Sequence, residues 1–176
     1  MTQSNSGTGY PSSTIIVFCF IRRGDEVLLI ERALPPYQWM RTIPGGHKQF
    51  GEEVAAACLR EMQEETGLLL HDCHFAGVMQ VHREGKQGPE ALCVYFAAES
   101  FSGELTPGPE GNLIWTPSAA IYTDKGTHPA LRALLPHIES GKYPFMAEAY
   151  VDDEGKGEYT VTSPGAQGKS VTGRHE

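Results

Sequence analysis

The chain has 176 residues, of which 40% are hydrophobic and 20% charged, a balance that suits one globular domain with its own core. Its 14 Lys and Arg residues face 22 Asp and Glu residues, which gives a formal net charge of −8. This sign argues against binding of long nucleic acid through its phosphates, although metal ions can still mediate local binding of a polyanion. No positively charged start leads into an apolar run, and the run at 15–21 is far shorter than the ~20 residues of a membrane span. We therefore expect a cytoplasmic protein with no membrane partner.

The two ends of the chain differ in composition from its middle. Residues 1–13 and 163–176 are rich in Ser, Gly and Thr and poor in large apolar groups. Such segments cannot bury enough apolar surface to offset the entropy lost on ordering. We predict two disordered tails around a single domain at 14–162.

The first predicted elements form a hairpin. Apolar and β-branched runs at 14–21 and 26–31 are separated by the turn-like Arg22-Arg23-Gly24-Asp25. A loop with two prolines and two aromatic residues follows, and it leads to Pro44-Gly45-Gly46, which no regular element tolerates.

The clearest helix in the sequence comes next, from Glu52 to Thr66. It contains no Gly or Pro, and Gly67 after it is a typical left-handed C-cap. At about 100° per residue, one apolar stripe is expected to face the core, formed by Val54, Ala55, Cys58, Leu59 and Met62. The glutamates of a neighbouring arc are Glu61, Glu64 and Glu65. Spacing alone leaves two interpretations, a solvated acidic face or carboxylates whose repulsion a divalent cation relieves.

The remainder of the chain alternates strand and helix signals. Strands are predicted at 75–82, 91–99 and 112–116, followed by a helix at 128–140 and a hairpin of 147–151 with 158–162. This order predicts an α/β fold in which helices cover both faces of a mixed sheet.

The four cysteines, Cys19, Cys58, Cys73 and Cys93, form no C-x-x-C pair and lie among apolar or helical neighbours. This distribution favours buried, reduced thiols over a disulfide framework or a zinc site.

A longer motif surrounds the glutamates of the predicted helix. Gly46 is followed after five residues by Glu52, and seven residues later by Arg60-Glu61-Met62-Gln63-Glu64-Glu65-Thr66-Gly67-Leu68. This matches every position of the Nudix box, G-x5-E-x7-R-E-U-x-E-E-x-G-U with U aliphatic, and Pro44-Gly45 completes the P-G-G common in the family. A chance match at a given start has a probability on the order of 10⁻¹⁰. Over residues 44–68 the chain therefore resembles the Nudix hydrolases.

The resemblance implies a Nudix-type α/β/α sandwich with a central mixed sheet, and a hydrolase of phosphoric anhydrides that uses Mg²⁺ or Mn²⁺. It implies that Glu61, Glu64 and Glu65 are catalytic residues and metal ligands, with Glu61 also orienting or deprotonating the attacking water. The carbonyl of Gly45 is implied as a neutral ligand. Hard oxygen ligands of this kind select Mg²⁺ or Mn²⁺ over zinc.

Three other residues of the motif are expected to support the site. Gly46 lets the backbone turn sharply before the helix. Glu52 and Arg60 are expected to pair and fix the loop against the helix rather than take part in catalysis.

Outside the box the resemblance points to four further residues. Glu110, a few positions before Trp115, resembles an acidic residue that joins the metal site in MutT-like members, and its alternative is a solvated turn residue. Arg32 resembles an arginine that touches substrate phosphate, and its alternative is a surface salt bridge. Tyr37 and Trp39 precede the Pro-Gly-Gly turn, where a base could stack on a ring.

The substrate is predicted mainly by elimination. His82 and Arg83 stand where ADP-ribose hydrolases tend to carry Pro, and Glu84, Gly85 and Lys86 stand where dinucleoside polyphosphate hydrolases carry Tyr. The pattern of coenzyme A hydrolases is also missing. What remains resembles the MutT-like group, which cuts nucleoside triphosphates, including oxidised purine ones such as 8-oxo-dGTP, to monophosphate and pyrophosphate.

Alternatives remain open. Within the same chemistry they are ADP-ribose, a nucleotide sugar or a dinucleoside polyphosphate as substrate. In another class, the chain is a catalytically silent Nudix-fold nucleotide-binding or sensor module, although the intact set of box glutamates favours an enzyme. The sequence does not determine the oligomeric state, but an open sheet edge would allow a homodimer.

Overall fold

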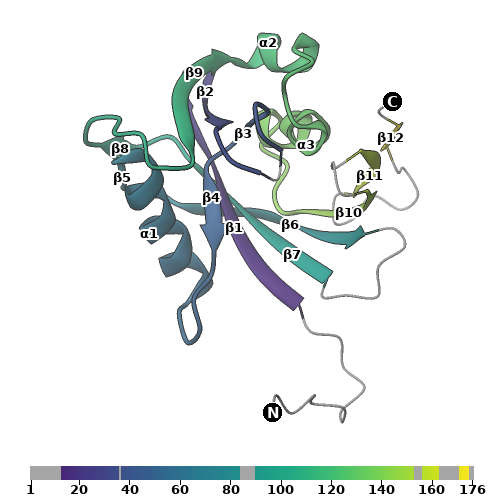
Figure 1. The fold of residues 1–176 in the computed structure, drawn as a ribbon, viewed down its shortest axis with the longest axis horizontal. Helices are drawn as coiled ribbons and strands as arrows, with labels where there is room; N and C mark the ends of the chain where they lie inside the picture. The colour runs from purple at the N-terminus through teal and green to yellow at the C-terminus, as the bar shows by residue number, and fades with distance from the viewer. Residues whose placement is uncertain (1–12, 36, 84–89, 153–155, 163–170, 175–176) are drawn as a thin grey trace.

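A ten-stranded mixed sheet forms the centre of the molecule, with helices on both faces (Figure 1). The computed structural model describes residues 13–35, 37–83, 90–152, 156–162 and 171–174. The strands are β1 (Ser13–Arg23), β2 (Glu26–Arg32), β3 (Arg41–Thr42), β4 (Gly45–His47), β5 (Leu69–Leu70), β6 (His74–Arg83), β7 (Glu90–Ala98), β8 (Phe101–Ser102), β9 (Gly111–Pro117), β10 (Phe145–Val151), β11 (Gly157–Thr162) and β12 (Val171–Arg174). The helices are α1 (Val54–Thr66), α2 (Ser118–Thr123) and α3 (Pro129–Glu139).

The sheet has the order β12-β11-β10-β6-β7-β1-β2-β3, with β4 also beside β1 and β9 beside β2. The pairs β1–β7 and β6–β10 are parallel, whereas β6–β7 and β10–β11 are antiparallel. A separate two-stranded sheet of β5 and β8 was not predicted. The expected mixed sheet and α/β sandwich are confirmed.

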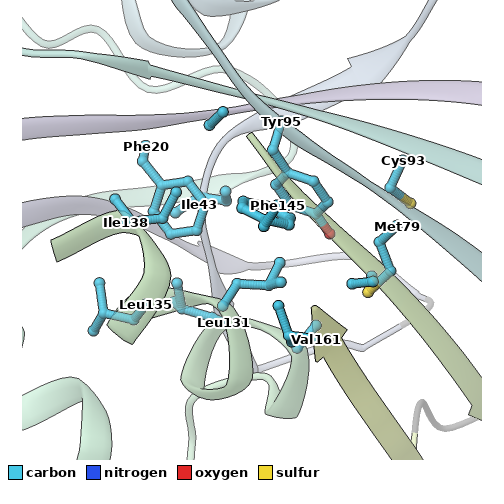
Figure 2. Packing of buried hydrophobic residues seen from close by; sticks show 14 of the residues in the cluster. Phe20, Ile43, Met79, Cys93, Tyr95, Leu131, Leu135, Ile138, Phe145 and Val161 are labelled. Carbon is cyan, nitrogen blue, oxygen red and sulfur yellow. The ribbon is translucent and has the colours of Figure 1, made fainter. Parts of the chain in front are cut away.

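Alternation along β1 divides the core into two halves. Val17, Cys19 and Ile21 pack with α1 on one face, and Phe20 packs with α3 on the other. Strand β7 does the same, because successive side chains of a strand point to opposite faces. The second half lies between the sheet and α3, where Phe145 packs beside Tyr95 (Figure 2).

Helix α1 begins at Val54, two residues later than predicted, and ends at the left-handed Gly67, whose φ of 76° confirms the predicted C-cap. Its buried face differs from the expected stripe, because Ala55 and Leu59 are exposed. The face that packs on the sheet contains Ala57, Cys58, Met62, Glu65 and Thr66. The helix is therefore rotated so that an acidic residue of the box lies within the buried face.

The ends of the chain also differ from the prediction. Ser13 already belongs to β1, and residues 171–174 form β12, which pairs antiparallel with β11. A short segment can gain main-chain hydrogen bonds at an open sheet edge without apolar side chains, which composition alone does not reveal. The other residues of both predicted tails lie outside the described parts of the chain. None of the described helices is long and apolar enough to cross a bilayer.

Candidate metal and nucleotide site

The glycine pair of β4 lies directly against α1. The backbone N–H of Gly45 donates to Oε2 of Glu65 across 2.8 Å. A Cβ atom on Gly46 would lie 2.2 Å from Oε2 of Glu61, and one on Gly45 would lie 2.3 Å from the carbonyl oxygen of Val17. Contrary to the predicted turn, both glycines lie in strand β4, and both are required by close approach, Gly46 to a carboxylate and Gly45 to the backbone of β1.

Arg60 holds the carboxylates of the helix and the preceding loop together. Its Nε and Nη2 atoms donate to the two oxygens of Glu52 at 2.8 and 3.0 Å. Its Nη1 atom donates to Glu61 at 2.8 Å and to Glu64 at 2.9 Å, and Nη2 also reaches the carbonyl of His47. Hydrogen bonds from Arg60 lower the pKa of Glu52 to about 2, so this carboxylate stays ionised. The pairing of Arg60 expected with Glu52 thus extends to two of the other three box glutamates, Glu61 and Glu64.

Glu65 is the most buried acidic residue of the site, with 6% of its surface exposed. Burial raises its pKa to about 8, and the negative charges of Glu110 and Glu61 act in the same direction. The hydrogen bond from Gly45 opposes this shift. Three carboxylates therefore influence one another around the glycine pair, an arrangement in which a bound cation favours the ionised form of each.

Two of the four residues predicted outside the box, Arg32 and Glu110, contact each other. Nη1 of Arg32 donates to Oε2 of Glu110 at 3.0 Å. Strand pairing sets Arg32 opposite Gly111, and the N–H of Ala33 donates to the carbonyl of Glu110 at 2.7 Å. Arg32 thus forms a salt bridge, which was the alternative predicted for it. The partner in this salt bridge is Glu110, the candidate metal ligand.

The donors gathered around the glycine pair are carboxylate and carbonyl oxygens, which suit a hard divalent cation. In the described parts of the chain, no three His, Cys, Asp or Glu side chains are arranged to hold a metal ion. Glu61 and Glu64 turn toward Arg60, Glu65 toward Gly45, and Glu110 toward Arg32. The residues therefore fit the implied metal by the chemistry of their oxygens, while these oxygens are directed at donors of the protein itself.

A cavity of about 400 Å³ lies beside the site, on the α3 face of the sheet. Most of its lining is apolar, and β1, β6, β7 and α3 contribute to it with residues that include Phe20, Met79, Tyr95 and Leu131. Arg32, Gly45, Gly46 and Glu110 also line it. The glycine pair therefore touches the cavity on one side and the carboxylates of α1 on the other.

The aromatic residues predicted to meet a base take different positions. Tyr37 lines the cavity, whereas Trp39 is 69% exposed and does not line it. Both have positive φ, 67° and 69°, an uncommon conformation for bulky residues. Trp39 N–H bonds to the carbonyl of Arg32 at 2.8 Å and Met40 N–H to that of Tyr37 at 3.0 Å, which hold the loop in this strained form.

His128, to which the sequence assigned no role, lines the cavity beside Tyr37, with ring centroids 4.6 Å apart. The N–H of Ala130 donates to its Nδ1 at 3.2 Å, so in the neutral ring the proton is on Nε2. Burial lowers its pKa to about 4, which keeps the ring neutral at pH 7. Nε2 is buried with no hydrogen-bond partner among the described residues. Only the helix-start signal of His128-Pro129 was available in the sequence, and it does not reveal that the Tyr37 loop lies nearby.

Trp115 is partly buried against the α1-side core, stacked on Phe101 at 5.7 Å with the guanidinium of Arg23 4.3 Å from its ring.

These observations define an α/β protein in which glutamates of a helix contact a pair of glycines in a neighbouring strand, the class to which Nudix domains belong. The NUDIX domain family model matches residues 12–138, and the chain belongs to this family. The box identified in the sequence is therefore a family motif in its expected structural setting.

Solved structures agree with the fold. The MutT protein of Bacillus halodurans superposes with a TM-score of 0.74 at 22% identity, covering 84% of this chain and 97% of that one. A MutT NUDIX hydrolase of Burkholderia pseudomallei has a TM-score of 0.56 at 27% identity, over 60% of this chain and 84% of that one.

Curated relatives share only part of their length with this chain. An ADP-ribose pyrophosphatase of Methanocaldococcus jannaschii is 30% identical over 99 residues, which are 56% of this chain and 58% of the relative. The human 8-oxo-dGDP phosphatase NUDT18 is 27% identical over 122 residues, which are 66% of this chain and 36% of that protein.

Proposed function

We propose that the protein is a divalent-metal-dependent hydrolase that cuts a diphosphate linkage in a small nucleotide substrate. The observation that carries this proposal is the position of the Gly45–Gly46 pair, which contacts Glu65 and Glu61 on one side and lines the cavity on the other. A molecule with an apolar or aromatic part in the cavity would place its phosphates over the glycine pair. Family membership and relatives named as phosphatases or pyrophosphatases support the same chemistry.

In this proposal Glu61, Glu64 and Glu65 hold Mg²⁺ or Mn²⁺ with the carbonyl of Gly45, and Glu110 completes the ligand set. The bound cation supplies charge neutralisation at the phosphates and lowers the pKa of bound water. Glu61 orients or deprotonates the attacking water, since Gly46 leaves its carboxylate room at the edge of the site.

The arginines have separate roles. Arg60 positions Glu61 and Glu64 from behind while its bidentate contact with Glu52 fixes the loop. Arg32 binds a substrate phosphate from the cavity side, where it already contacts a carboxylate oxygen of Glu110. Phosphate and carboxylate present the same kind of acceptor to a guanidinium, so the exchange preserves its hydrogen bonding.

The cavity is proposed to take the nucleobase. Its apolar lining suits a flat aromatic ring, Tyr37 supplies an aromatic contact, and the Nε2–H of His128 offers one donor to a base acceptor. A nucleoside triphosphate such as 8-oxo-dGTP, cut to monophosphate and pyrophosphate, is the specific substrate proposed. The relatives named for ADP-ribose and 8-oxo-dGDP make those two compounds the principal competitors.

The test is hydrolysis of a substrate panel with Mg²⁺ or Mn²⁺, monitored by separation of the nucleotide products. The panel contains 8-oxo-dGTP, 8-oxo-dGDP, dCTP, ADP-ribose, a diadenosine polyphosphate and a nucleotide sugar. Three proteins are compared: the wild type, Glu64→Gln, and Glu148→Gln as a control at an exposed glutamate on β10. We expect metal-dependent turnover that Glu64→Gln abolishes and Glu148→Gln retains.

Activity that persists unchanged in Glu64→Gln would reject the proposed site. A wild-type protein inert on every compound would favour the nucleotide-binding module instead. The highest kcat/KM within the panel identifies the substrate, and a preference for ADP-ribose would overturn the choice of 8-oxo-dGTP alone.

A further inference from the structure

Three cysteine thiols from three elements meet on the α1 face of the sheet. Cys19 lies on β1, Cys58 on α1 and Cys73 just before β6. The Sγ atoms of Cys58 and Cys73 are 3.9 Å apart, within reach of an S–H···S hydrogen bond. We call these three residues the thiol cluster. All of its members are free thiols, and the site proposed above uses none of them.

The members of the thiol cluster differ in access to solvent. Cys19 and Cys58 have no exposed surface, whereas Cys73 is only partly buried, contrary to the expectation for all four cysteines. The neighbouring Asp72 accepts hydrogen bonds from the N–H groups of Glu99 and Ser100 at 3.0 and 2.7 Å, which fix the segment that carries Cys73. Cys73 is therefore the thiol that a small reagent reaches first, at a defined position.

The environment of Cys73 also favours its reactive form. Hydrogen bonding with Cys19 and Cys58 lowers the pKa of the Cys73 thiol, while burial raises the pKa of Cys19. A thiolate is the nucleophilic form of cysteine, so this environment favours attack by Cys73 over attack by its two buried neighbours.

We propose that Cys73 is a peroxide-reactive cysteine that forms a reversible disulfide with Cys58, cross-linking α1 to the start of β6. The Cys73 thiolate attacks one oxygen of hydrogen peroxide, the O–O bond breaks, hydroxide leaves and Cys73 becomes a sulfenic acid. Cys58 then loses its proton and attacks the Cys73 sulfur, which forms the S–S bond, breaks the S–O bond and releases water. In total the two thiols lose two electrons and peroxide is reduced to two waters.

Cys58 is a better partner than Cys19 because of what holds each residue. Cys19 is in a strand paired on both sides, and its N–H bonds to the carbonyl of Pro44 at 3.1 Å. Cys58 is on a helix held to the sheet mainly by side-chain packing. The Cys58 and Cys73 sulfurs must approach by about 2 Å to reach the S–S length of about 2.0 Å. A helix can supply this shift more readily than a central strand.

The shift has a consequence for the glutamates, and this part rests on the proposed function. Cys58 shares the buried face of α1 with Glu65. Glu61 lies between them in the sequence, about one turn after Cys58. In the structure Glu65 contacts Gly45, and Glu61 lies close to Gly46. A movement of the helix toward Cys73 changes both distances. We expect the disulfide to slow metal-dependent hydrolysis at least about tenfold, because misplacement of catalytic groups by about 1 Å has large effects on rate.

The experiment exposes the reduced full-length protein to hydrogen peroxide, blocks remaining thiols and maps cross-linked peptides by mass spectrometry. The variants are Cys73→Ser, Cys58→Ala and, as a control from the opposite core, Cys93→Ala. We expect a Cys58–Cys73 cross-link in the wild type and Cys93→Ala and none in the other two. Cys58→Ala should instead leave a sulfenic acid on Cys73 that dimedone traps.

A cross-link to Cys19 or Cys93, one that persists without Cys73, or oxidation of Cys73 to sulfinic acid with no disulfide overturns the proposal. If the mapped disulfide forms and dithiothreitol removes it without a change in hydrolysis, the regulatory part is wrong. A reduced wild type that hydrolyses nothing would count against the proposed function, while the peptide map would still decide the disulfide.

Discussion

The N–H of Gly45 and Oε2 of Glu65, 2.8 Å apart, join strand β4 to the last turn of helix α1. This contact holds a carboxylate that is nearly excluded from solvent at the point where the glycine pair meets the cavity. Because this contact needs only an acceptor oxygen, a substitution can remove the charge of Glu65 and keep the contact.

Replacing Glu65 with Gln should keep the hydrogen bond to Gly45, because an amide oxygen accepts it equally well, and should remove the negative charge. We expect kcat with Mg²⁺ to fall by about two orders of magnitude or more, because several kcal/mol of charge stabilisation are lost. Calorimetry of the metal-free protein at pH 7 should show a Tm no lower than that of the wild type, because burial already disfavours the charged form of Glu65. A variant with full activity would show that Glu65 is only structural.

The two glycines of β4 should respond differently to substitution by Ala. In Gly46→Ala the new methyl meets the movable end of Glu61, so we expect activity to be lost with about 1 kcal/mol or less of lost stability. In Gly45→Ala it meets the backbone oxygen of Val17, which cannot move freely, so we expect a loss of about 2 kcal/mol or more. Urea unfolding and initial rates on the two variants test this, and equal losses of stability would contradict it.

Arg60→Lys should weaken metal use with little effect on substrate binding. Lys keeps the charge but cannot make the paired contacts to Glu52 while also reaching Glu61 and Glu64. We expect activity at limiting Mg²⁺ to fall about 10- to 100-fold and to recover partly at high Mg²⁺. A magnesium titration checks this, with Arg23→Lys at the β1–β2 turn as the matched control. An unchanged magnesium dependence would contradict the positioning role.

The part of the site that could be predicted from sequence is the part carried by one continuous stretch. Gly46, Glu61 and Glu65 lie within the box, so helical periodicity and the family pattern were enough to place them together. Arg32 and Glu110 were identified separately, but they are 78 residues apart, and only the pairing of β2 with β9 brings them into contact. No local pattern contains that information.

Other differences have equally physical causes. The apolar stripe on α1 was predicted to include Leu59, yet the helix is rotated so that Glu65 is buried and Leu59 is 42% exposed. A rule that places apolar residues inside and charges outside fails where a buried carboxylate accepts a hydrogen bond from the backbone, as Glu65 does from Gly45. His128 was overlooked for a related reason, since its position in the cavity wall beside Tyr37 follows from the tertiary fold and not from its neighbours in the chain.

His128 also predicts how stability depends on pH. Its folded-state pKa of about 4 lies below the ordinary value of 6.5, because burial and the charges of Arg132 and Arg32 disfavour the protonated ring. The unfolded chain therefore binds more protons between these values, so the stabilisation is complete above pH 6.5 and is lost as pH falls toward 4. The loss should amount to up to about 3 kcal/mol.

The variant His128→Asn tests this dependence. Its amide oxygen can still accept from the N–H of Ala130, but the side chain does not titrate. The difference in unfolding free energy between pH 7 and pH 4.5 should therefore shrink by most of that amount. His137, whose pKa burial also lowers, contributes to both proteins and cancels in the comparison. Urea unfolding at both pH values gives the two differences, and an identical pH dependence in wild type and variant would show that His128 is not held neutral by the fold.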